Sequence, residues 1–77
     1  MSGNNNGKNL VAIDSGSLTQ NNARKYLLVI AGDDDTTVTL EGQAPFTINS
    51  GGAWEPRLAP TNAITFSGAF TAVTDEV

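Results

Sequence analysis

Hydrophobic residues recur along this chain in short alternating runs that are separated by Gly, Asn, Asp and Ser. The strongest run is Arg24–Ala31, which stops at Gly32. The run Thr36–Glu41 alternates cleanly, with Val38 and Leu40 on one face. Alternation with a period of two residues is typical of a half-buried β-strand, and a short continuous apolar run that stops at a glycine is typical of a fully buried one, so both runs predict strands. Shorter runs predict further strands at Asn9–Asp14, Ala44–Asn49, Asn62–Phe66 and Ala69–Thr74.

The connections between these runs carry turn residues and prolines. Residues 32–35, Gly-Asp-Asp-Asp, predict a turn, because Asp and Gly accept the backbone conformations of tight turns. We expect a hairpin between the two strands that flank this turn. Residues 53–60 contain two prolines four positions apart, which exclude a central strand and a helix interior. This stretch is expected to be an extended segment at a sheet edge, anchored by Trp54 and Leu58.

The pattern as a whole predicts a polar arm followed by one β domain. Residues 1–8 are polar and hold two glycines, so we expect a flexible N-terminal arm. Residues 9–77 contain six or seven short strands at regular spacing. This predicts an all-β domain, a small antiparallel β-sandwich or barrel with almost no helix. Nine Thr residues fit such a fold, because β-branched side chains suit the exposed side of a sheet. The last three residues, 75–77, are expected to fray.

The run Arg24–Ala31 has an apolar residue on nearly every position of both faces. Such a strand must be covered on both sides. No helical period elsewhere in the chain could supply a cover of helices. A second β layer can cover one face, and the other face requires a loop, the chain's own terminus or a neighbouring subunit. The two faces are Tyr26, Leu28 and Ile30 on one side and Leu27, Val29 and Ala31 on the other.

The 77 residues include no His and no Cys. The chain therefore cannot form a Ser-His-Asp or Cys-His relay, a thiolate nucleophile, an ordinary zinc site or a disulfide. We expect a protein that is not an enzyme and carries no cofactor. Domains of this size bury a smaller share of their surface than larger ones, and they usually gain a disulfide, a metal or a partner subunit. Of these, assembly into a homo-oligomer is the device we expect here.

Eight acidic residues outnumber four basic ones, which gives a formal net charge of -4. Nucleic-acid binding requires a clustered basic surface, and the only adjacent basic pair is Arg24 with Lys25. We therefore expect no nucleic-acid partner. No apolar run approaches the roughly 20 residues that cross a bilayer, so no membrane partner is expected either.

The densest group of carboxylates is the turn Asp33-Asp34-Asp35, and carboxylate oxygens are the ligands that Ca²⁺ prefers. The chain lacks the alternating Asp spacing of a calcium loop, so we interpret these residues as a solvated acidic turn rather than a metal site. Paired carboxylates can also hydrolyse glycosides. Asp14, Glu41 and Glu55 qualify by residue type alone, and so small a domain has little volume for a substrate cleft.

Four residues are candidates for an interface with a partner: Tyr26, Trp54, Arg57 and Leu58. Trp, Tyr and Arg are enriched at protein interfaces. Trp54 can be an anchor at a subunit interface or a lid over the core of its own chain, and the sequence favours neither. Arg57 can pair with an acidic residue across an interface, although a solvated charge is the default for a surface Arg.

Several segments together resemble a known class of proteins. They are Arg24–Ile30, the polar turn after it, Thr37–Leu40, Gly51-Gly52, Leu58-Ala59-Pro60 and Ala63-Ile64. This progression, over residues 24 to 70, resembles small β-sandwich virion proteins of tailed bacteriophages. The resemblance implies a non-enzymatic capsid decoration (cement) protein that docks on the major capsid protein of the head lattice, commonly as a trimer. A component of the tail or fibre is also compatible with it.

Two classes of function therefore stand as expectations. The first is a structural protein of the virion, located at the capsid surface, that stabilises a shell by burying apolar surface at symmetric junctions. The second is a module that binds carbohydrate or a host surface, with Trp54 and Tyr26 as stacking platforms.

Overall fold

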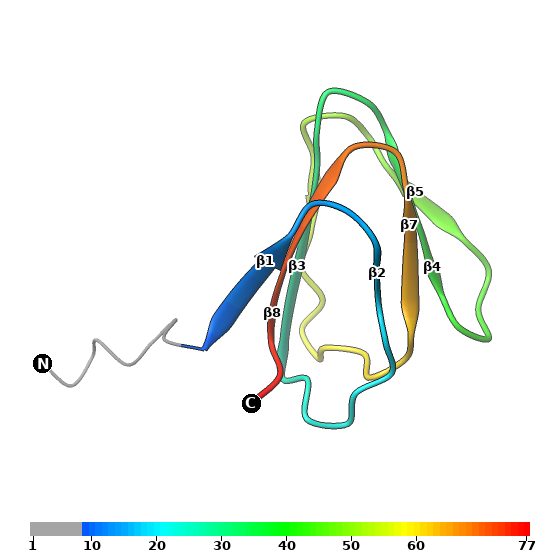
Figure 1. Cartoon of the computed structure of the whole chain (residues 1–77). Coiled ribbons are helices and arrows are strands. Elements are labelled where there is room, and N and C mark those ends of the chain that lie inside the picture. The colour runs from blue at the N-terminus through cyan, green and yellow to red at the C-terminus, as the bar shows by residue number, and fades with distance from the viewer. Residues whose placement is uncertain (1–8) are drawn as a thin grey trace, which may run out of the picture.

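The computed structural model describes residues 9–77, so the arm predicted at residues 1–8 lies outside the described part of the chain. Residues 9–77 form eight strands and no helix, arranged as two four-stranded antiparallel sheets (Figure 1). The sheets pack against each other around a shared core. The predicted fold class, a small antiparallel β-sandwich, is confirmed.

The strand orders of the two sheets match each other position by position. The strands of the first sheet are, in spatial order, β1 (Leu10–Ile13), β8 (Phe70–Asp75), β3 (Tyr26–Ala31) and β6 (Ala53–Trp54). Those of the second sheet are β2 (Ser17–Leu18), β7 (Ile64–Ser67), β4 (Thr36–Leu40) and β5 (Phe46–Ile48). Each strand of the first sheet is joined along the chain to the strand at the same position in the second sheet. This is the strand order of a jelly roll, an eight-stranded sandwich built from two Greek keys.

The hairpin predicted between β3 and β4 is wrong, because residues 32–35 carry the chain from one sheet to the other. Hydrogen bonds to two other connections that cross between the sheets (crossings) fix its position. The amide of Gly32 donates to the carbonyl of Ala69 over 2.8 Å, and the buried hydroxyl of Thr36 donates to the same oxygen over 2.6 Å. The amide of Gly51 donates to the carbonyl of Gly32. The connection therefore bonds to two other crossings at this end of the sandwich, which are seen together in Figure 1.

Gly68 is required where two of these crossings meet. Its φ is +100°, in the left-handed region that side chains rarely adopt. A Cβ atom built at this position would overlap the carbonyl oxygen of Asp35. Glycine therefore lets the crossing between β7 and β8 approach the crossing between β3 and β4.

The core lies between the sheets; six strands contribute buried hydrophobic residues, and β1 and β6 contribute the partly buried Ile13 and Trp54. Leu27 and Val29 of β3 face Val38 of β4 and Ile64 of β7, and all four are fully buried. The aromatic rings of Phe66 and Phe70 stack with centroids 4.3 Å apart. The buried hydrophobic residues are Leu18, Leu27, Val29, Ala31, Val38, Leu40, Ile48, Ile64, Phe70 and Ala72. One face of β3 is thus covered by the second sheet, as expected.

Two local expectations were wrong. Residues 75–77 were expected to fray, but Asp75 is the last residue of β8, and Glu76 accepts a hydrogen bond from a buried Arg24. Leu58 was expected to anchor the segment between β6 and β7, but its side chain is 87% exposed. The expectation of an edge location holds, because β6 is an edge strand of its sheet. Strand β2 was not predicted, since two residues carry no measurable alternation.

Candidate functional site

The outer side of the first sheet is predominantly apolar. Because the inward residues of β3 and β8 are buried, their alternate residues point away from the core. Residues directly opposite in antiparallel strands share a face, and the register places Ala12, Val73 and Leu28 in one row across three strands. A second row contains Thr71, Ile30 and Ala53, and a third row places Asp75 between Leu10 and Tyr26. We call this surface the apolar face and define it by Leu10, Ala12, Leu28, Ile30, Ala53 and Val73.

Much of the apolar face is accessible to solvent. Leu10 is 42% exposed and Ile30 is 38% exposed, whereas Leu28 and Val73 are half-buried. On the outer side of β3, Tyr26 and Leu28 are half-buried and Ile30 is exposed, whereas the inward residues Leu27, Val29 and Ala31 are buried. Residues 9–77 of a single chain therefore fully cover only one of the two apolar flanks that the sequence shows. Contiguous exposed apolar surface on a small protein often marks a site of interaction.

The outer side of the second sheet has the opposite character. Register and alternation place only hydroxyl residues there, so we call it the hydroxyl face. It consists of Ser17, Thr37, Thr39, Thr47, Thr65 and Ser67. Thr37 lies opposite both Thr47 and Ser67, and Thr39 lies opposite Thr65. The two faces of the sandwich share the same architecture, so the concentration of apolar residues on one of them singles out that face as the candidate site.

The candidate residues Tyr26 and Trp54 lie on opposite sides of the first sheet. Tyr26 lies at the rim of the apolar face, where its hydroxyl donates a hydrogen bond to Glu55 over 2.6 Å. This hydrogen bond is the main cause that raises the pKa of the Tyr26 phenol above its ordinary value, with smaller contributions from desolvation and from the charge of Glu55. Trp54 is opposite the inward-facing Val29 and packs against the core. Its ring meets that of Phe46 edge to face, with centroids 4.8 Å apart.

Trp54 is therefore in the position of a lid over its own core, one of the two roles left open by the sequence. Because Tyr26 lies on the other side of the sheet, the two rings do not form one stacking platform. Arg57 and Leu58 are both exposed on the segment between β6 and β7. The structure thus does not bring the four candidate residues together on one surface.

A buried arginine was missed by sequence analysis. The side chain of Arg24 is fully buried and its Nε donates to Glu76 over 2.6 Å. Its remaining nitrogens donate to three backbone carbonyls, those of Thr19, Pro60 and Asn62, at 2.7 to 2.8 Å. We call this arrangement the Arg24 clamp. It joins the segment before β3, the segment before β7 and the end of the chain, so it is structural and lies beneath the surface.

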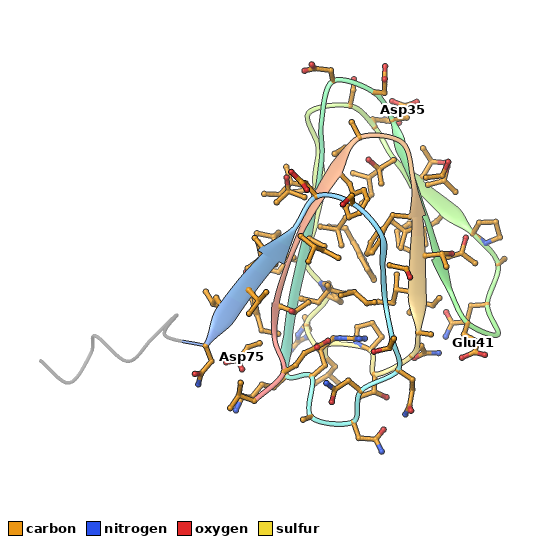
Figure 2. The ribbon with its side chains drawn as sticks, viewed as in Figure 1. Asp35, Glu41 and Asp75 are labelled. Carbon is orange, nitrogen blue, oxygen red and sulfur yellow. The ribbon has the colours of Figure 1, made fainter. Side chains whose placement is uncertain are left out.

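Three acidic residues from different connections and strand ends lie far from one another. Figure 2 shows Asp35, Glu41 and Asp75 at three well-separated places. Asp35 accepts a hydrogen bond from the amide of Ser50 over 2.8 Å and so holds a connection between sheets. Across residues 9–77, no three acidic side chains gather in a way that could hold a metal ion. Asp14 follows β1 and Glu41 follows β4, at opposite ends of the sandwich, so they do not form a carboxylate pair.

The described part of the chain contains no helix long and apolar enough to cross a membrane. Comparison of the chain with protein-family models, with curated proteins and with solved structures finds no match. The apolar face is therefore assigned from its own chemistry alone.

Proposed function

We propose that this chain is a non-enzymatic structural protein of a virion, a decoration protein that docks on the major capsid protein of the head lattice through its apolar face. The observation that carries the proposal is the exposure of Leu10 and Ile30 on a face to which all four strands contribute apolar residues. Docking would remove this surface from water, which favours association at about 25 cal/mol per Å² of apolar area.

The composition of the two faces supports docking through one side. The hydroxyl face carries no large apolar residue, so it remains compatible with water after docking. A protein attached to a shell in this way presents one side to the shell and the other to solvent. The jelly roll also occurs in viral capsid and lectin domains, although a fold by itself does not define a function.

The apolar face also indicates how docking would respond to salt. Its defining residues are uncharged. Asp75 lies between Leu10 and Tyr26 at the last row of the face, and Glu55 accepts the hydrogen bond of Tyr26. Attraction between exposed charges is screened by salt, whereas apolar burial is not. We therefore expect the chain to stay on its particle at high ionic strength.

The test is recovery of the chain with purified particles of the phage that encodes it. Wild-type chain should sediment with the particles in a density gradient at a fixed ratio to the major capsid protein. Ile30→Glu places a carboxylate on the apolar face, and Thr39→Glu places one on the hydroxyl face at the middle of a central strand. The first variant should lower occupancy at least about tenfold, which corresponds to about 1.4 kcal/mol, and the second should leave it unchanged.

Two results would overturn the proposal. One is the absence of the chain from purified particles, and the other is equal loss of occupancy in both variants. Binding to a glycan array that Tyr26→Ala abolishes would favour the carbohydrate module instead, since Tyr26 lies on the outer side of the sheet whereas Trp54 packs against the core.

A further inference from the structure

The free edge of β1 is the least protected strand edge in the described chain. All four of its residues, Leu10–Ile13, are apolar, yet three are exposed and the fourth is half-buried. Val11 points to the inner side of the sheet but is 60% exposed. Figure 1 shows β1 projecting away from the second sheet, so the inner side of β1 lacks a full cover. One edge of its backbone pairs with β8 and the other has no partner strand among residues 9–77.

The other three edge strands are short, and two of them lie beside proline. Strands β2 and β6 have two residues each, and Pro56 follows β6 closely. Strand β5 has three residues and begins directly after Pro45. Short edges and prolines prevent a sheet from adding another strand, whereas a longer apolar edge favours it. Among the described edges, β1 alone has neither form of protection.

We propose that β1 pairs with β1 of a second copy of this chain, antiparallel and around a two-fold axis perpendicular to the sheet. Two identical edges are complementary in this arrangement, because each supplies the backbone donors and acceptors that the other lacks. The strand carries no charge, so no like charges are brought together within the pair. The two-fold axis limits the assembly to two chains, since each chain has one such edge.

The side chains select the register of this pair. Residues opposite each other across an antiparallel pair share a face, so outward residues must oppose outward residues. With Val11 opposite Val11 of the second copy, Leu10 lies opposite Ala12. Moving the axis to Ala12 would place Leu10 opposite the carboxylate of Asp14. The first register instead places Ile13 opposite the uncharged Asn9, so no carboxylate faces an apolar residue of the strand, and it joins the apolar faces of both copies into one surface.

This pairing does not depend on the proposed docking to a shell, and it differs from the trimer that the resemblance implies. It can be tested on the purified full chain by sedimentation equilibrium. The expected mass is twice the 8.0 kDa of one chain. Val11→Asp should raise the dissociation constant of the dimer by about tenfold or more, because it places a carboxylate in the pair. Thr47→Asp, an exposed position on the edge strand β5, should leave the dimer intact.

Cysteine substitution tests the register, because the natural chain has no Cys. Opposed residues in an antiparallel pair have Cβ atoms about 5 Å apart, close enough for a disulfide after a small adjustment. Val11→Cys should therefore cross-link rapidly to a covalent dimer on mild oxidation. Ala12→Cys, which faces Leu10 in this register, and Thr47→Cys should cross-link slowly.

Three results would overturn the inference. A monomer at every concentration tested would exclude the pair. An oligomer that Val11→Asp leaves intact and Ile30→Glu dissociates would place the contact on the apolar face instead of the β1 edge. Faster cross-linking of Ala12→Cys than of Val11→Cys would contradict the register. The variants place changes at exposed positions, and the fluorescence of Trp54 reports whether each is folded.

Discussion

Replacement of Arg24 by Met should remove a large part of the stability of this domain. Methionine keeps an apolar stem of similar length but provides no charge and no donor. The four hydrogen bonds of the Arg24 clamp would be lost at once. Three of the acceptors are backbone carbonyls, and their distances along the chain range from 5 to 38 residues. The substitution therefore removes four of the contacts that join these segments, while the hydrogen bonds from Asn21 to Thr61 and to Glu76 remain.

The structure allows a rough magnitude for this loss. Breaking a buried ion pair by removing one partner costs about 3 to 5 kcal/mol, because the remaining groups are left unpaired. Glu76 is 28% exposed and can regain contact with water, which places the cost nearer the lower limit. A chain of this length has a total stability of about 4 to 12 kcal/mol. A loss of about 3 kcal/mol should lower the Tm by at least about 12 °C.

Urea unfolding followed by the fluorescence of Trp54 measures this change directly, since Trp54 is the only Trp and packs against the core. Lys25→Met is the matched control, because it removes the same charge from the adjacent, exposed position. We expect the control to change the free energy of unfolding by less than about 0.5 kcal/mol. Glu76→Gln keeps an acceptor and should have an effect between the two. A cost below about 1 kcal/mol for Arg24→Met would refute the role of the clamp.

Two further predictions concern a glycine and a tyrosine. Gly68→Ala should destabilise the fold by about 3 kcal/mol or more, because the left-handed conformation and the overlap with Asp35 both oppose a side chain. Gly16 is also left-handed but has open space around it, so Gly16→Ala should cost about 1 kcal/mol. Thermal unfolding of both variants checks this, and equal losses would contradict the packing argument. The phenol of Tyr26 should titrate above its ordinary pKa in the folded chain and near it in urea, and Glu55→Gln should lower the folded value. Because the neutral phenol is favoured in the fold, this contribution to stability is present at neutral pH and is lost as the pH rises through the raised pKa. Absorbance titration of the only Tyr measures the pKa in both states, and equal values in the folded and unfolded chain would contradict the prediction.

Much of the fold could be predicted because alternation records which residues face the core. Strand β4 was located this way, and its inward residues Val38 and Leu40 were identified correctly, whereas β3 was located as a short apolar run that stops at a glycine. Alternation does not record which strand lies beside which. A four-residue polar connection can close a hairpin or cross between sheets, and here the outcome depends on the distant carbonyl of Ala69. A local pattern cannot contain that information.

The Arg24 clamp could not be predicted for a related reason. Arginine at the start of a strand usually extends into solvent, and a buried arginine requires several acceptors. The acceptors of Arg24 include the backbone of Pro60 and Asn62 and the side chain of Glu76, the last 52 residues away. Backbone acceptors leave no trace in the identity of the residues that carry them. The edge position of β1 could not be predicted from the sequence either, since its residues are typical of any short strand.

The two faces of β3 show what the sequence could and could not decide. Its apolar residues on both sides predicted two covers, and the second sheet supplies one of them over Leu27 and Val29. Strand propensity does not explain the apolar residues on the other side, because the hydroxyl face shows that Thr and Ser serve equally well on the outer side of a strand in this fold. The exposure of Ile30 has a cost in solubility that threonine at the same position would avoid. A partner on the apolar face is the simplest physical reason for that cost, which makes Ile30→Thr a stringent comparison: it should leave the fold stable and weaken docking.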